Sequence, residues 1–340
     1  MPFDHDAILN HVRELQRRVR DRILSLRGVA DLHFTERHLP EDTIYRLDEA
    51  VEATVISYCE EWGAETPLVL IAEGLGAQSL VFPRTCRPED ALVRVLLDPI
   101  DGTRGLMYDK RPGWCLAGAA PNRGPQTRLS DIEVAVMTEL PTNKMNQADV
   151  LWSVRGNGAH GVRHDLITGT TRPVPLAPSQ ATNLDHGFAS VSSFFPGTKR
   201  LAAELVELLA ERLTHSDHTS PLLFDDQYIA TGGQLYELLV GHDRLIVDLR
   251  ALFCQIENRP PGLCVHPYDL SAMLIAQEAG VVLTDSFGHP LDGPLDLRTS
   301  LDWCGYANPR LRERVEPIIQ EFLRPRIVSI GTCEHRPSSR

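Results

Sequence analysis

VLLDPIDGTRG, residues 95–105, joins a hydrophobic strand directly to two aspartates, Asp98 and Asp101, that are three positions apart. A carboxylate at the end of a buried strand is costly to desolvate. Two carboxylates so close also repel each other unless a positive charge lies between them. The stretch therefore raises the hypothesis of a bound cation at the end of this strand.

The residues around the two aspartates allow a second interpretation. Pro99 and Gly102 favour a sharp turn, which would let both carboxylates and the carbonyl of Ile100 converge on one point. Oxygen ligands of this kind suit Mg²⁺, which takes few protein carboxylates and keeps several waters. Asp, Pro and Gly also favour turns for local reasons, so the stretch by itself fits a metal site and an ordinary turn equally well.

A second strand ends in an acid. LVLIAEG, residues 68–74, is an apolar run that finishes at Glu73. Parallel and mixed sheets collect ligands at the carboxyl ends of their strands, so Glu73 is a candidate partner of Asp98 and Asp101. Taken in isolation, Glu73 reads as an ordinary surface glutamate after a strand.

Two further aspartates occupy helix positions. The helix predicted to begin at Asp42 or Thr43 carries Asp48 as the only charged member of one face, whose other members are apolar: Ile44, Val51 and Val55. Asp269 lies near the start of a later helix, after Pro267. Periodicity alone favours a solvent-reaching edge for Asp48 and a helix cap for Asp269.

The order of the predicted elements indicates two α/β units. Two amphipathic helices and a run of strands make up the first half, and strands alternate with helices after the Pro-rich stretch RPVPLAPSQ, residues 172–180. We therefore expect an α+β subdomain over residues 1–180, an α/β subdomain over 181–325 and a tail over 326–340. In the last helix Asn308 is the expected cap and Pro309 the first-turn residue.

Bulk composition limits the partners. The chain has 340 residues, 42% of them hydrophobic, a formal charge of −12 and seven scattered cysteines without a CxxC pair. The acidic charge argues against nucleic acid as a partner, and the cysteine pattern fits neither a disulfide framework nor a thiolate zinc site. No stretch has the composition of a signal peptide or a membrane span, so we expect a cytoplasmic protein without a membrane partner.

With these residues collected, the chain resembles the inositol monophosphatase family. This family belongs to a lithium-sensitive, magnesium-dependent phosphatase superfamily with the fructose-1,6-bisphosphatases and the 3′-phosphoadenosine phosphatases. DPIDGT, residues 98–103, and YDLSAMLIAQEAGVVLTDSFG, residues 268–288, carry the likeness, and RGNGA (155–159) and GYANPRL (305–311) are weaker matches. Order and spacing agree over residues 5–325. The resemblance implies a layered αβαβα sandwich and a phosphoric monoester hydrolase.

The resemblance also implies roles at the metal centre. Glu73, Asp98 and the carbonyl of Ile100 would hold one Mg²⁺, and Asp98, Asp101 and Asp269 a second. A third ion near Glu73 is common in the family, but Gly74 stands where many members have another acid, so two or three ions are expected. The sequence does not distinguish Mn²⁺ from Mg²⁺.

Substrate contacts follow less directly from the resemblance. Gly102 and Thr103, with Asp101, would bind the phosphate, while Asp48 would accept a hydrogen bond from Thr103 and help deprotonate the attacking water. Arg104 and Asp248 are candidate substrate contacts, although residues 248–269 form a longer segment than is typical. Two further cations after Arg104 suit a second phosphate or plain surface charge: Lys110 and Arg111.

Three functions therefore stay open. The first is hydrolysis of inositol monophosphate or a related polyol or sugar phosphate. The second is 3′-phosphoadenosine phosphatase or fructose-1,6-bisphosphatase activity, and the third is non-catalytic binding of a phosphorylated metabolite. In each case the partner is a small phosphorylated metabolite, and the family implies a homodimer.

Overall fold

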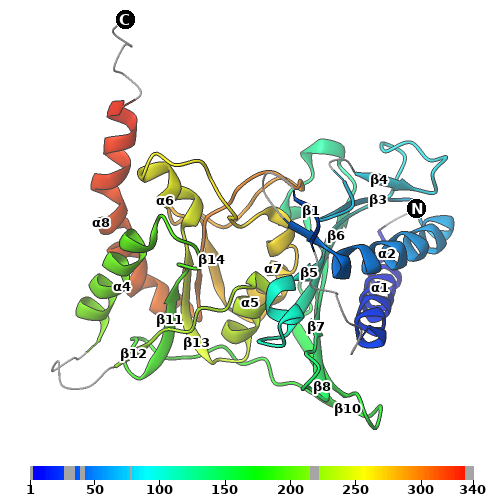
Figure 1. Cartoon of the computed structure of the whole chain (residues 1–340), viewed down its shortest axis with the longest axis horizontal. Helices are drawn as coiled ribbons and strands as arrows, with labels where there is room; N and C mark the ends of the chain where they lie inside the picture. The colour runs from blue at the N-terminus through cyan, green and yellow to red at the C-terminus, as the bar shows by residue number, and fades with distance from the viewer. Residues whose placement is uncertain (1–2, 27–34, 39–42, 77–78, 215–221, 334–340) are drawn as a thin grey trace, which may run out of the picture.

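The structure is a computed structural model that describes residues 3–26, 35–38, 43–76, 79–214 and 222–333. It contains two β-sheets with helices between them and on their outer faces (Figure 1). Among the helices of the described ranges, none combines the length and apolar composition needed to cross a bilayer.

Eight strands form the first sheet, in the spatial order β10-β9-β8-β7-β6-β5-β3-β4. Neighbours β3 and β5 run parallel, and the other neighbouring pairs of this sheet are antiparallel. The strands are β3 Leu68–Ala72, β4 Leu80–Phe82, β5 Val93–Asp101, β6 Gly113–Pro121, β7 Val134–Leu140, β8 Gln147–Val154, β9 Ala159–Asp165 and β10 Thr171–Pro173.

The second sheet is mixed and has the order β12-β11-β13-β15-β14. Its strands are β11 Gly187–Val191, β12 Leu223–Phe224, β13 Asp243–Asp248, β14 Val282–Thr284 and β15 Trp303–Tyr306. A separate hairpin pairs β1 Thr35–His38 with β2 Thr43–Tyr45. The chain passes from the first sheet to the second between β10 and β11, within and after the Pro-rich stretch 172–180.

Helices complete five layers. The α-helices are α1 His5–Ser25, α2 Arg46–Glu65, α3 Thr103–Met107, α4 Lys199–Leu213, α5 Thr231–Leu239, α6 Arg250–Ile256, α7 Met273–Glu278 and α8 Pro309–Cys333. The short 3-10 helices are η1 Gly124–Gln126, η2 Leu129–Asp131 and η3 Pro267–Leu270. Helices α1 and α2 cover the outer face of the first sheet, α5 and α7 lie between the sheets, and α4 and α8 cover the outer face of the second.

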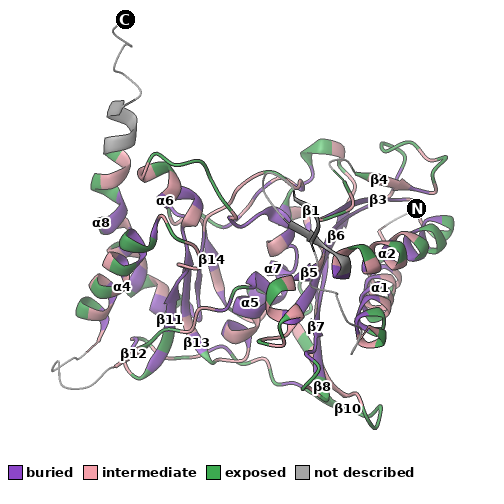
Figure 2. Ribbon diagram, viewed as in Figure 1, coloured by how far each residue is buried: buried purple, intermediate pink, exposed green. Residues whose placement is uncertain are grey.

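Burial follows from this layering (Figure 2). Along β5, Val95 packs with α1 and α2, whereas Leu96 packs with the middle layer. Successive side chains of a strand point to opposite faces, and both faces of this sheet are covered, so its central strands are apolar throughout. The predicted αβαβα sandwich is confirmed.

Two predicted boundaries are wrong. Helix α2 begins at Arg46, because Thr43 pairs in strand β2, and Asp42 lies outside the described residues. Helix α8 continues to Cys333, past the start of the tail predicted at residue 326. The predicted cap of α8 is confirmed, since the Leu311 amide donates to the Asn308 side chain at 2.9 Å.

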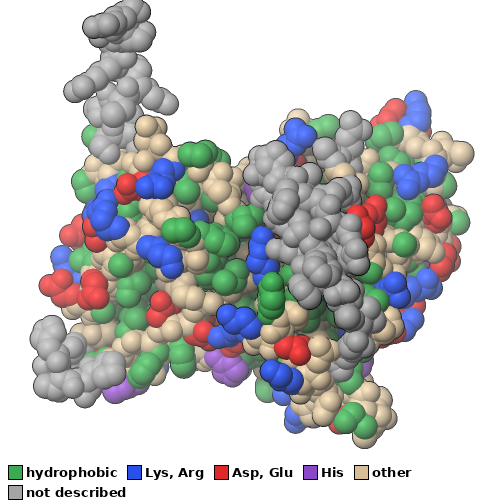
Figure 3. Space-filling model, in the orientation of Figure 1, with side chains coloured by type: hydrophobic (Ala, Val, Ile, Leu, Met, Phe, Trp, Pro, Cys, Tyr) green, Lys and Arg blue, Asp and Glu red, His purple; other side chains and the backbone are tan. Residues whose placement is uncertain are grey.

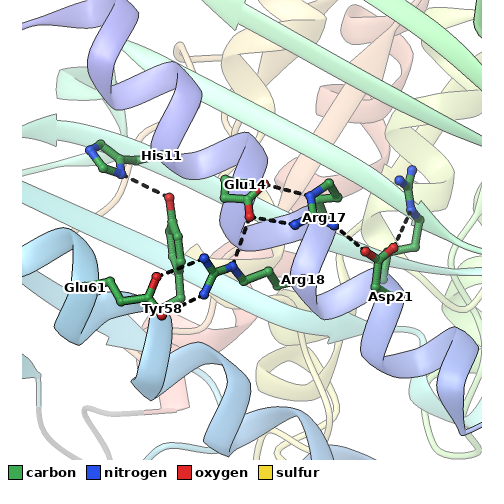
Figure 4. Close-up of polar contacts among 8 residues, drawn as sticks. His11, Glu14, Arg17, Arg18, Asp21, Tyr58 and Glu61 are labelled. Carbon is green, nitrogen blue, oxygen red and sulfur yellow. Dashed lines mark hydrogen bonds and ion pairs between the residues drawn. The ribbon is translucent and has the colours of Figure 1, made fainter.

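Polar contacts align α2 with α1 on the outer face of the first sheet (Figure 4). Arg18 of α1 donates two hydrogen bonds to Glu61 of α2, at 2.8 and 2.9 Å, and its guanidinium lies 4.5 Å from the centre of the Tyr58 ring. The Tyr58 hydroxyl is 3.0 Å from His11. Exposed ion pairs add little stability, so these contacts chiefly orient α2 over the buried apolar interface.

Gly118 of β6 sets how closely the middle layer approaches the first sheet. A Cβ atom at this position would lie 2.4 Å from the Ser271 carbonyl oxygen and 2.5 Å from Ile132 Cδ1. We expect Gly118→Ala to lower the free energy of unfolding by about 1–3 kcal/mol, since the backbone after η3 must move. Urea unfolding measures this, with Gly262→Ala, where a Cβ would meet no atom within 4 Å, as the control. Equal stability of the two variants would contradict this packing.

Candidate metal and phosphate site

A bulge in β5 puts the two aspartates of the DPID segment on one face. Asp98 lies opposite Leu116 of β6, and Asp101 opposite Trp114, so three steps along β5 match two steps along β6. Leu116 and Trp114 both pack in the middle layer. Without the extra residue, strand alternation would send Asp98 and Asp101 to opposite faces.

The sharp turn predicted at this stretch is therefore a bulged strand end instead. Pro99 lies beyond Leu97, the last residue of β5 that pairs with β3, so its missing N–H breaks no hydrogen bond to that strand. Gly102 follows with φ of 82°, and a Cβ there would be 2.9 Å from that of Ala230, just before α5. Both conditions require glycine at 102.

Asp269 joins the pair from the middle layer, which packs directly on β5. It belongs to η3, and single carboxylate oxygens of Asp98, Asp101 and Asp269 lie within 4.8 Å of one another. Asp98 is fully buried and Asp101 is 7% exposed. Residues 171 positions apart in the chain thus form one acidic cluster, which the family resemblance implied and the helix pattern around Asp269 did not.

Backbone amides orient all three carboxylates. The Ile100 amide donates to Asp98 at 3.0 Å, the Gly232 amide to Asp101 at 2.6 Å, and the His266 amide to Asp269 at 2.6 Å. The Gly232 amide belongs to the first turn of α5, where N–H groups lack partners within the helix. These bonds hold the acidic side chains in place before any cation binds.

The cluster is electrostatically strained without a cation. Burial, then the neighbouring carboxylates, raise the pKa of Asp98 well above its ordinary value, and burial and Asp269 do the same to the pKa of Asp101. Burial raises the pKa of Asp269 to about 6. Oδ2 of Asp98 is buried without a hydrogen-bond partner. A divalent cation with oxygen ligands fits this donor set, since it would neutralise the charges and occupy the orphaned oxygen.

Glu73 stands at the edge of the cluster. It directly follows β3, which is parallel to β5 with Ala72 opposite Leu97, so Glu73 and Asp98 leave adjacent strand ends. The Glu73 charge contributes to the raised pKa of Asp98. Glu73 lines the same cavity, half-buried, beyond the three carboxylates that lie within 4.8 Å of one another.

Thr103 links the cluster to α2. Its hydroxyl is 2.8 Å from the Ile100 carbonyl and 3.3 Å from Oδ1 of Asp48, and it can donate its proton to either. Asp48 is half-buried and lines the cavity, so the acid in the apolar stripe of α2 does face the other predicted site residues. The Ile100 carbonyl, a predicted metal ligand, lies at the same junction.

A cavity of about 450 Å³ contains the predicted phosphate-binding residues and the acidic cluster. Arg104 and Lys110 line it as exposed cations, and Arg111 lines it while paired with Asp226. Asp248 takes a different position from the one expected of a substrate contact. It is 1% exposed, and Arg250, which does line the cavity, covers its carboxylate.

Several cavity residues were missed by sequence reasoning. Arg250, Phe194 and Phe195 form one wall, and His266 lies beside Asp269. Helix α5, whose first turn binds Asp101, was also missed. Its first three residues, Thr231-Gly232-Gly233, do not predict a helix, because glycine is a poor helix former. The two phenylalanines read as strand core.

Comparison with known proteins identifies the fold of the chain but no family model or curated relative. No family model matches the chain, and no curated protein does. Solved structures do match: an inositol monophosphatase of Thermotoga maritima has 16% identity and a TM-score of 0.62, covering 94% of this chain and 98% of that one. The fructose-1,6-bisphosphatase of Leishmania major has 14% identity and a TM-score of 0.62, covering 93% and 92%. Extragenic suppressor protein SuhB of Bartonella henselae has 15% identity and a TM-score of 0.62, covering 93% and 99%.

The chain therefore has the layered α/β fold that these solved structures share. More particularly, it has the inositol monophosphatase fold, as the resemblance of its motifs implied.

Metal-free protein should lose stability as pH rises. The folded-state pKa of Asp269 is raised to about 6, above the unfolded value of about 3.9, so its contribution to folding is present at low pH and is lost as pH passes 6. The loss is on the order of 3 kcal/mol for this group alone. We expect the Tm of chelator-treated protein to fall between about pH 4 and 7, and Mg²⁺ to restore it.

The rise in Tm on addition of Mg²⁺, called here the Mg²⁺ increment, distinguishes cation binding at the cluster from other effects of pH. Burial also raises the pKa of Glu139, Asp243 and Asp302 to about 7, and these distant groups add to the fall without binding the ion. Scanning calorimetry should show a larger Mg²⁺ increment at pH 8 than at pH 5. An increment independent of pH would argue against cation binding by the cluster.

Proposed function

We propose that this protein catalyses Mg²⁺-dependent hydrolysis of a small phosphomonoester by attack of water. One observation carries the proposal: the carboxylates of Asp98, Asp101 and Asp269, the first two buried and the third half-buried, meet within 4.8 Å in a cavity of about 450 Å³. A hydrogen-bonded Thr103 and Asp48 pair lines the same cavity. Phosphate transfer to water requires positioning and charge neutralisation more than covalent chemistry, and this cavity has the groups for both.

The residues divide into two metal-ligand sets. Glu73, Asp98 and the Ile100 carbonyl would hold one ion, and Asp98, Asp101 and Asp269 another, with Glu73 also available to a third. Bound Mg²⁺ would offset the carboxylate charges, attract the substrate phosphate and make water a stronger nucleophile. Mn²⁺ favours similar oxygen ligands, so it is a second candidate.

Thr103 and Asp48 would handle the proton. When the Thr103 hydroxyl donates to Asp48 and not to the Ile100 carbonyl, its oxygen lone pairs are free to accept from a water molecule beside the cluster. As that water loses a proton, the proton can pass through Thr103 to the half-buried Asp48 carboxylate. Backbone amides at Gly102 and Thr103, where α3 begins, are the proposed donors to the phosphate.

The fold supports this class of reaction but does not identify the substrate. Inositol monophosphatases and a fructose-1,6-bisphosphatase share the fold, so a polyol or sugar phosphate is the first candidate. Phosphate release from inositol, sugar and nucleotide monoesters with Mg²⁺ tests the proposal and ranks the substrates. Absence of release across the whole panel at saturating Mg²⁺ would overturn it in favour of non-catalytic binding.

A homodimer in the cytoplasm is the assembly and location that we propose with this activity. The resemblance to the family motivates the dimer, and light scattering tests it directly. A monomer at micromolar concentration would contradict it.

Asp98→Asn should abolish phosphate release without loss of fold. The substitution removes a charge that both proposed ions share, but keeps the oxygen that accepts from the Ile100 amide. Because it also relieves repulsion within the cluster, the metal-free variant should melt no lower than wild type at pH 8. Its Mg²⁺ increment in Tm should disappear.

Asp165→Asn is the matched control, since Asp165 ends β9 and does not line the cavity. It should retain both activity and the Mg²⁺ increment. Turnover of Asp98→Asn near the wild-type rate would remove Asp98 from the proposed mechanism.

Asp48→Asn should reduce kcat and leave the Mg²⁺ increment in place. Asp48 is proposed to accept a proton and holds no ion, so its loss should cost about 10²–10⁴-fold in kcat. Steady-state kinetics and melting curves on the same samples separate the two roles. Loss of the Mg²⁺ increment in this variant would place Asp48 among the metal ligands.

A further inference from the structure

Arg250 is a largely buried cation that lines the cavity, and its charge is opposite in sign to that of the acidic cluster. It begins α6, directly after β13, and its side chain is 12% exposed. It lines the cavity together with Asp101 and Asp269. The Arg250 charge is near enough to lower the pKa of both carboxyls, against the larger effect of burial.

Contacts with Asp248, the Leu263 carbonyl and two phenylalanine rings fix the orientation of this guanidinium. Asp248 accepts from Nε at 2.8 Å and pairs with Nη2 at 2.8 Å, and the Leu263 carbonyl accepts from Nη1 at 2.6 Å. The Phe194 and Phe195 rings lie 4.8 and 5.7 Å from the guanidinium carbon. Arg250 is therefore held rigidly before any ligand arrives.

Donor capacity remains after these contacts. A guanidinium has five N–H donors, and the contacts with Asp248 and the Leu263 carbonyl engage at most three of them. At least one N–H of Nη1 and one of Nη2 therefore remain. Guanidinium N–H groups match the oxygens of a carboxylate or phosphate.

The pair with Arg250 also changes what Asp248 can do. A carboxylate facing the cavity would accept hydrogen bonds from the hydroxyls of a polyol. Here that carboxylate is 1% exposed and its charge is matched by Arg250, so the cavity wall presents guanidinium N–H donors in place of a carboxylate. Arg104 and Lys110, exposed on the cavity lining, add positive charge.

We propose that Arg250 binds a second anionic group of the substrate, so that the phosphomonoester hydrolysed at the acidic cluster also carries a carboxylate or a second phosphate. This inference rests on the proposed function for its reaction. It makes Arg250 a specificity-determining residue, while the acidic cluster, Thr103 and Asp48 carry the chemistry. Across the described part of the face in Figure 3, acidic and basic side chains are mixed, so the selection for an anion is a property of the cavity.

Matched substrate pairs test the inference. Fructose 1-phosphate and fructose 1,6-bisphosphate differ by a phosphate, and glycerol 3-phosphate and 3-phosphoglycerate differ by a carboxylate. Wild-type protein should have a higher kcat/KM on the doubly anionic member of at least one pair. The pair that shows the preference identifies whether the second group is a phosphate or a carboxylate.

The decisive variant changes Arg250→Gln and Asp248→Asn together. Arg250→Gln alone leaves a buried, unpaired Asp248 and risks misfolding, whereas the double variant removes one charge of each sign. Losing a hydrogen bond to a charged group should lower kcat/KM on the doubly anionic member about 10- to 100-fold. The singly anionic member should change by less than about threefold.

Arg250→Lys gives a second, milder variant that keeps the charge and loses the planar guanidinium donors. Its loss on the doubly anionic substrate should lie between those of wild type and the double variant. Equal losses on both members of each pair in these variants would mean that Arg250 acts on the scissile phosphate. An unchanged preference would mean that it binds no substrate group, and either result overturns the inference.

Binding measurements separate this inference from the proposed function. Calorimetry with fructose 1,6-bisphosphate and 3-phosphoglycerate, with Ca²⁺ in place of Mg²⁺, reports affinity without requiring turnover. Binding of either probe that falls at least tenfold in the double variant, in a protein that releases no phosphate, would support Arg250 as the anion contact and refute hydrolysis. Probe binding unaffected by the double substitution would refute the role of Arg250 alone.

Discussion

The repulsion among Asp98, Asp101 and Asp269 is the constraint on which the rest of the site depends. Two buried carboxylates and a half-buried one within 4.8 Å of one another would oppose folding if all were ionised and unpaired. The fold meets this cost in part with backbone amides from Ile100, Gly232 and His266. The repulsion that these amides do not offset increases the affinity of the cluster for a cation, because a bound ion removes repulsion as well as forming bonds.

The layered fold explains how such distant residues meet. The β5 bulge turns Asp98 and Asp101 toward the middle layer, and that layer is built from elements that follow the first sheet in the chain, α5 and η3. Gly118 lets the backbone after η3 approach β6 closely, and Gly102 leaves room for Ala230. The acidic cluster is thus a product of the contact between the first sheet and the middle layer, and it cannot assemble from the first sheet alone.

Much of this was predictable from local sequence. Glu73 and Asp98 end apolar runs, and the charged residue in the α2 stripe was visible from periodicity, because these signals need only strand alternation or helical spacing. The bulge was predicted as a turn, because Pro and Gly favour a bulge and a turn equally. Only the pairing register of β5 against β6 distinguishes the two. The Asp101 contact with α5 and the Asp248 pair with Arg250 depend on tertiary packing. No spacing along the chain indicates that Arg250 would cover the acid two positions before it.

The two ends of the cavity consequently differ in charge: one holds the acidic cluster and the other holds Arg250. At one end the carboxylates carry excess negative charge that cations would reverse, and at the other the Arg250 charge is already balanced by Asp248, with two phenylalanine rings fixing its plane. A bound ligand with anionic groups at both ends would meet a metal-dependent contact and a metal-independent one. Because Arg250 is preorganised, it would orient such a ligand at little entropic cost, leaving the phosphate that meets the cluster as the reacting group.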